Sequence, residues 1–65
     1  METKETYIKD LKKNDRIKGV CATLQVISNK NGLLTLYNER TGVFFDADYR
    51  RFVKRNAKVE TFKGV

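Results

Sequence analysis

Hydrophobic and polar positions alternate along most of this chain, and the alternation predicts short β-strands. Residues 16–28 are rich in Ile, Val and Thr, but their alternation changes phase beside Gly19. A phase change at a glycine is typical of a bulge or sharp bend within a long strand. We therefore expect one long, bent first strand over 16–28.

Two turn sequences divide the middle of the chain. Asn31-Gly32 suits the positive φ angles of a hairpin turn, and residues 39–42 (Glu-Arg-Thr-Gly) make a second tight turn. They predict strands over 33–38 and 43–48. With the first strand, these two strands would form a β-meander.

A helical pattern follows the meander. It predicts a short helix over 49–55, capped by Asp48 and stopped by Asn56, and then a final strand over 58–63. Spacing of i, i+3, i+4 gives the helix one apolar face and one basic face. The aromatic residues of this part that we expect in the core are Tyr49, Phe52 and Phe62.

The start of the chain shows less pattern. We expect residues 1–6 to be flexible and residues 7–65 to form one domain. Residues 7–11 suit a short turn packed on the core, with a polar turn at 12–15. The predicted order is three strands, a helix and a fourth strand, which indicates a mostly-β small barrel.

Composition narrows the chemistry. Cys21 is the single cysteine and there is no histidine, so an internal disulfide and a zinc site are excluded, and no cofactor is predicted. Asp46 and Asp48 share a strand face, but two carboxylates alone are a weak metal signal. Without a nucleophile–base pair we expect no enzyme activity. No apolar run spans a membrane and no signal peptide is recognisable, so a cytoplasmic protein is expected.

The positive charge is concentrated near the end of the chain. The net charge is +6, of which residues 49–65 contribute six Lys/Arg against one acid. A clustered positive field attracts polyanions. The alternative interpretation is a lysine-rich surface that keeps a small protein soluble.

Two segments resemble oligonucleotide-binding (OB-fold) domains. Residues 8–17 (IKDLKKNDRI) resemble the entry to such barrels, especially the N-terminal OB domain of YhaM-type 3′-to-5′ exoribonucleases. Residues 34–44 (LTLYNERTGVF) are similar to a hairpin of OB domains in replicative polymerases and class II aminoacyl-tRNA synthetases. Asn14 replaces the usual glycine of the entry turn. An OB-fold has five strands, so a fifth is missing here or supplied by residues 7–11, a partner chain or a parent protein.

The resemblance implies single-stranded nucleic-acid binding on the strands 33–38 and 43–48. There aromatic side chains stack on bases while cations contact phosphates. If Leu34 and Leu36 point inward, Tyr37 and Phe44 point outward as an exposed aromatic pair, bracketed by nearby cations. The predicted binding residues are Lys18, Lys30, Tyr37, Arg40, Phe44, Arg50, Arg51, Lys54 and Arg55.

Two alternatives stay open at this level. A register shift of one residue would place Tyr37 and Phe44 in the core. The four cations of the helix, which repel one another in the absence of an acid on their face, are either a phosphate-contacting patch or a solvated helix face.

The leading hypothesis is therefore a module that binds single-stranded RNA or DNA with low sequence specificity, with a possible homodimer or parent protein completing the barrel. The alternative is a protein–protein adaptor with an Sm-like or SH3-like barrel, whose exposed strand edge pairs with a partner.

Overall fold

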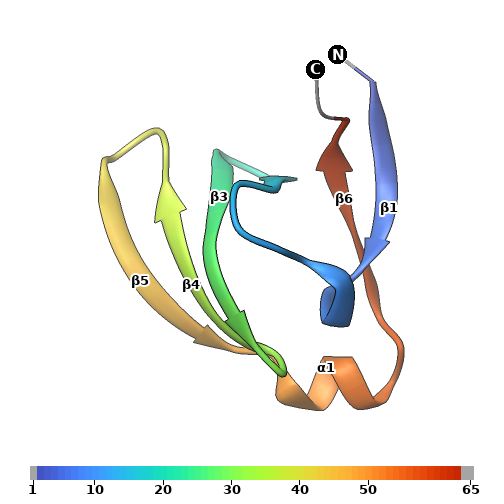
Figure 1. Cartoon of the computed structure of the whole chain (residues 1–65). Helices are drawn as coiled ribbons and strands as arrows, with labels where there is room; N and C mark the ends of the chain where they lie inside the picture. Colours follow the sequence, from blue (N-terminus) through green and yellow to red (C-terminus); the bar gives the residue numbers. More distant parts are fainter. Residues whose placement is uncertain (1, 64–65) are drawn as a thin grey trace.

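The computed structural model describes residues 2–63, which form one antiparallel sheet and two short helical segments (Figure 1). Met1 and Gly64–Val65, which fall in the predicted flexible N-terminus and the predicted domain, lie outside the described residues. The elements in chain order are β1 (Thr3–Tyr7), the 3-10 turn η1 (Ile8–Asp10), β2 (Arg16–Lys18), β3 (Thr23–Lys30), β4 (Leu33–Asn38), β5 (Val43–Asp48), α1 (Arg50–Lys54) and β6 (Lys58–Phe62).

The strand order in the sheet is β1-β6-β2-β3-β4-β5. Strands β2 to β5 form a meander, and α1 then carries the chain across the end of the curved sheet, so that β6 returns beside β2 (Figure 1). Strands β1 and β5 are the two edges and do not pair with each other. The mostly-β prediction is confirmed, but the predicted barrel is wrong because the sheet stays open.

The predicted strand order is also wrong at the N-terminus. Residues 3–7, most of which were expected to be flexible, form β1 and pair with β6 from Thr3 opposite Phe62 to Tyr7 opposite Lys58. Alternating polar residues concealed this strand, because an edge strand with one solvated face carries little hydrophobic signal. The chain therefore supplies the additional strand from residues 3–7 rather than from residues 7–11.

The predicted long first strand is in fact two strands. Residues 19–22 form a turn, in which the N–H of Gly19 donates to the carbonyl of Ala22 at 3.0 Å, and β2 and β3 pair antiparallel on either side. The change of phase at Gly19 therefore marks a hairpin. A register irregularity does occur later in β3, between Val26 and Ser28.

The core lies on the concave face of the sheet, where η1 and the residues after it cover the middle strands (Figure 1). Its buried apolar side chains are Ile8, Leu11, Ile17, Val26, Leu34 and Leu36. Asn29 joins η1 to the sheet, because its side-chain amide donates to the carbonyls of Ile8 at 2.8 Å and Leu11 at 2.9 Å. The predicted packing of the segment at 7–11 on the core is confirmed.

Left-handed backbone occurs where the sequence suggested it. Asn31 and Gly32 have φ angles of 54° and 100° in the β3–β4 turn, and Asn14 and Asn56 have φ angles of 77° and 53°. Asn and Gly are the residues that adopt this conformation at least cost. These turns and the end of α1 are thus confirmed.

Candidate nucleic-acid interface

Strands β4 and β5 are paired in the register that exposes the aromatic pair. Leu36 lies opposite Phe45 on the inner face, and Tyr37 lies opposite Phe44 on the outer face. The two rings of the outer pair have centroids 4.7 Å apart and planes inclined at 48°. Phe44 is 62% exposed, whereas Tyr37 is half-buried. The register in which both rings would lie in the core is therefore excluded.

The pair continues a row of outward side chains across four strands. Directly opposed residues of neighbouring strands point to the same face of the sheet. Arg16 lies opposite Gln25, Gln25 opposite Tyr37, and Tyr37 opposite Phe44. Sequence reasoning did not place Arg16 or Gln25 at the site, because neither strand pairing is visible in the linear pattern. Arg16 forms a bidentate ion pair with Glu39, at 2.9 and 2.7 Å.

Arg16 is a constrained cation at one end of this row. The hydrogen bonds to Glu39, helped by its charge, raise the pKa of Arg16, and the pKa of Glu39 is correspondingly lowered. The guanidinium carbon also lies 5.7 Å from the centroid of the Phe62 ring. Phe62 therefore lies next to Arg16 on the outer face, and the prediction that it belongs to the core is wrong.

Three cations predicted to bind nucleic acid lie at different distances from the aromatic pair. Arg40 lies in the turn beside the pair, and its guanidinium reaches the carbonyl of Cys21 at 3.5 Å. Lys18 ends β2, with its ammonium 3.9 Å from Glu60. Lys30 pairs with Leu33 at the opposite end of β4, about 13 Å along the strand from Tyr37. The aromatic pair is thus flanked by Arg40, but not by Lys30.

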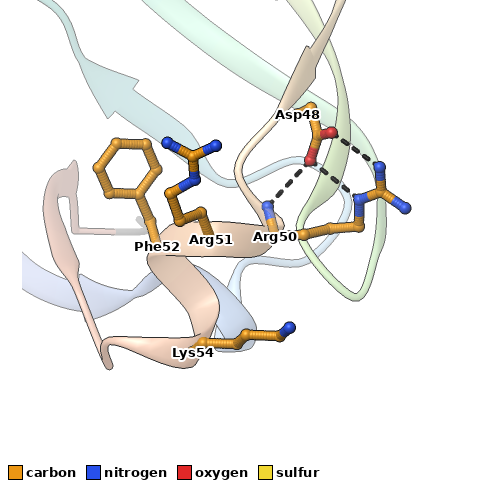
Figure 2. Close-up of a pocket in the computed structure, with 5 residues that line it drawn as sticks. All are labelled: Asp48, Arg50, Arg51, Phe52 and Lys54. Atoms are coloured by element: carbon orange, nitrogen blue, oxygen red, sulfur yellow. Dashed lines mark hydrogen bonds and ion pairs between the residues drawn. The ribbon is translucent and has the colours of Figure 1, made fainter.

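The basic helix α1 lies beyond the far end of β5. Asp48 accepts three hydrogen bonds from Arg50: from the backbone N–H at 3.1 Å, from Nε at 3.0 Å and from a terminal guanidinium nitrogen at 2.8 Å (Figure 2). The side-chain bonds, and then the backbone bond, lower the pKa of Asp48 to about 2. The N-cap position is Tyr49, not Asp48 as predicted, and Asp48 lies one residue earlier, where it binds the N–H of Arg50 and neutralises its side chain.

The remaining helix cations have no such partner. Within residues 2–63 the ion pairs engage Arg50, Lys58 and Lys63 of the basic C-terminal segment, whereas Arg51, Lys54 and Arg55 have none. All three are exposed. The basic patch is thus defined by these three residues, and it carries three unpaired charges rather than the four that sequence reasoning assigned.

Phe52 belongs to this surface rather than to the core. It is 41% exposed and, with Asp48, Arg50, Arg51 and Lys54, lines a hollow of about 400 Å³. In Figure 2 the Phe52 ring and the Arg51 side chain rise from the same side of α1, and Lys54 extends on another. Tyr49 and Val53 instead pack against the core, which was predicted for Tyr49. A five-residue helix has too little surface to bury all three apolar side chains.

Acidic groups separate the aromatic pair from the basic patch. Asp46 lies on the outer face of β5 between Phe44 and Asp48, and its carboxylate accepts a hydrogen bond from the Thr35 hydroxyl at 2.9 Å. Consecutive outward residues on a strand are about 6.6 Å apart. A polyanion that reached both surfaces would therefore pass close to Asp46.

The described residues also bear on the predictions about metal ligands, Cys21 and membrane spans. Within residues 2–63 no group of three or more His, Cys, Asp or Glu side chains is placed to hold a metal ion. Cys21 is exposed in the β2–β3 turn, not in the apolar strand expected for it. None of the helices within that range is both long and apolar enough to cross a membrane.

Comparisons with protein-family profiles, with curated proteins and with solved structures found no match to this chain.

Proposed function

We propose that this protein binds single-stranded nucleic acid without catalysing a reaction, and that bases stack on the Tyr37–Phe44 pair. The observation that carries the proposal is the exposed ring of Phe44 beside the half-buried ring of Tyr37, on the outer face of a chain with a net charge of +6. An exposed ring accepts any base, and each stack contributes about 1–3 kcal/mol. Low sequence specificity follows, since stacking reads no base edge.

The basic patch supplies the phosphate contacts in this proposal. Arg51, Lys54 and Arg55 lie just beyond the end of β5, about 13 Å or more from Phe44. Their unpaired charges repel one another, and a polyanion relieves that repulsion. Arg40 contacts a phosphate of the nucleic acid on the other side of the Tyr37–Phe44 pair. Arg50 contributes less, because Asp48 already neutralises it.

The test measures affinity for labelled oligo-U, oligo-dT and duplex DNA over a range of salt concentrations. Tyr37→Ala should weaken binding of both single strands about tenfold, and duplex binding should be the weakest of the three. Neutralising the basic patch (Arg51, Lys54 and Arg55 to Gln) should reduce the slope of log K against log salt by about 2, at about 0.7 per phosphate contact.

A matched control removes the same charge elsewhere. Lys4, Lys58 and Lys63 lie on or beside β1 and β6, and the last two are already in ion pairs. Changing these three to Gln should alter the slope much less. Equal effects of the two triple variants would mean that the binding depends on the net charge of the protein and not on the basic patch. No binding at low salt would reject the proposal.

The adaptor hypothesis keeps one observation in its favour. The edge strand β5 exposes Val43, Phe44 and Phe45 in succession. Such an edge presents unpaired backbone groups and apolar side chains to another strand. If the wild-type protein binds no nucleic acid at low salt, strand pairing at this edge becomes the leading function.

A further inference from the structure

The two edges of the sheet differ in how well they are protected. Strand β1 carries Lys4 and Glu5, and Glu5 pairs with Lys58 at 3.8 Å. Charged side chains of this kind discourage pairing with another chain. Strand β5 begins with three apolar residues, Val43, Phe44 and Phe45, which are 55%, 62% and 38% exposed. Figure 1 shows β5 at the open end of the sheet, with no element on its outer side.

We propose that β5 pairs with β5 of a second copy of this chain, antiparallel about a two-fold axis, with Phe44 opposite Phe44. This inference is independent of nucleic-acid binding. A two-fold contact buries the same patch on both copies and closes the edge of each. Val43 of each copy then lies opposite Phe45 of the other, so the exposed apolar residues of β5 cover one another.

The neighbouring registers are less favourable. Pairing centred on Phe45 would place Phe44 against the carboxylate of Asp46, and pairing centred on Asp46 would oppose two like charges. Direct like-charge partners destabilise a strand pair, whereas aromatic partners stabilise it. A register that places Phe44 of one copy opposite Phe45 of the other is excluded, because directly opposed residues of two paired strands point to the same face of the sheet. Phe44 points to the outer face and Phe45 to the inner face. The side chains of β5 therefore select the pairing centred on Phe44.

Charge at the two ends of the contact agrees with this register. It brings the 39–42 turn of one copy alongside the C-terminal half of β5 of the other. Arg40 in that turn has no carboxylate partner within residues 2–63, and Asp46 accepts its side-chain hydrogen bond from a neutral hydroxyl. In this register Gly42 of one copy lies opposite Asp46 of the other, which brings Arg40 to the same end of the contact. The Arg40 side chain is turned toward Cys21 by one hydrogen bond of 3.5 Å, and on association it rotates toward Asp46, an attraction between opposite charges.

The pairing leaves the outer face open. Tyr37 and Phe44 lie on that face in each copy, so the two aromatic pairs would adjoin across the seam as one strip. The basic patches, by contrast, lie near opposite ends of the contact. Because each copy carries +6, their repulsion opposes association, and added salt should strengthen it.

The mass of the full chain in solution is the first test. Sedimentation equilibrium without nucleic acid should show twice the 7.6 kDa chain mass as the protein concentration rises from about 10 µM to about 1 mM, the weak range expected for a small contact. Phe44→Lys should stay monomeric, and its exposed position keeps the fold intact, which circular dichroism checks. A wild-type monomer throughout this range would overturn the proposal, as would assemblies larger than a dimer.

Cross-linking then tests the register. In a Cys21→Ser background, Phe44→Cys places two thiols on directly opposed residues, whose Cα atoms are about 4.5–5.5 Å apart, a separation that a disulfide can bridge. Asp46→Cys is the matched control, since two residues 46 would lie about 13 Å apart along the strands. Under mild oxidation the Phe44→Cys chain should cross-link at least tenfold faster. Faster cross-linking by Phe45→Cys or Asp46→Cys would overturn the register.

Discussion

Gly32 lies directly against the backbone of Arg50: a Cβ atom at position 32 would be 2.8 Å from both the nitrogen and the Cα of Arg50. The contact is reinforced by the N–H of Tyr49, which donates to the Gly32 carbonyl at 2.7 Å. Through it, the β3–β4 turn is docked on the start of α1. The basic patch therefore owes its place to a glycine about twenty residues earlier in the chain.

Gly32→Ala should destabilise the fold by about 2–4 kcal/mol. The added methyl group would meet backbone on one side, and the φ angle of 100° is unfavourable for alanine. Urea unfolding would measure the loss. Gly42→Ala is the control, since φ is also positive there, but the nearest atom is the Tyr37 hydroxyl at 3.7 Å. It should cost about 1–2 kcal/mol, and an equal cost at both positions would contradict the docking contact.

Asn29→Ala should destabilise the protein by about 1–3 kcal/mol, because it leaves part-buried backbone groups unpaired. Its side chain donates to the carbonyls of Ile8 and Leu11 and accepts from the N–H of Gly32 at 2.9 Å. Asn29→Asp should cost more, since a carboxylate would face two carbonyl oxygens. Thermal unfolding would measure both, with Thr35→Ala as a control that loses one exposed hydrogen bond.

Asp48 should titrate with a pKa of about 2, below its ordinary value of 3.8. The lowered pKa means that the ionised carboxylate stabilises the fold fully above about pH 4, and that this contribution is lost as the pH falls through about 2. Carboxyl NMR would follow the titration. In Arg50→Gln the pKa should return towards 3.8, and an unchanged value would show that Arg50 is not the cause.

Asp46→Asn should strengthen binding of single-stranded oligonucleotides about threefold. A phosphate about 7 Å from this carboxylate in water is repelled by about 0.6 kcal/mol. The asparagine retains an oxygen that accepts from Thr35, so the strand pair is preserved. Titration at low salt would measure the change, and the effect should disappear at high salt. Weaker binding by this variant would mean that the oligonucleotide does not pass along β5.

Local features of this protein were predictable from sequence because they depend on near neighbours. Asn31-Gly32 predicts its turn, Asn56 the end of α1, and alternation in 33–38 the inward side of Leu34 and Leu36. The same alternation allowed two registers for the aromatic pair, and only the pairing of β4 with β5 decided between them. Arg16 could not be found in this way, since only strand pairing places it in a row with Tyr37, and Phe52 was misplaced because helical spacing does not say how much core is available.

A mostly-β domain and the turns at 31–32 and 39–42 could be predicted from the sequence alone, since side-chain alternation and turn chemistry act over a few residues. The register that points Tyr37 and Phe44 outward needed the pairing of β4 with β5. Tertiary structure decided that β1 exists, that the residues around Gly19 form a hairpin, that the sheet stays open, and that Asp48 neutralises Arg50. These features depend on which distant strands meet. A polar edge strand such as β1 is stabilised by its partner β6, and that partner is 50 residues or more away along the chain.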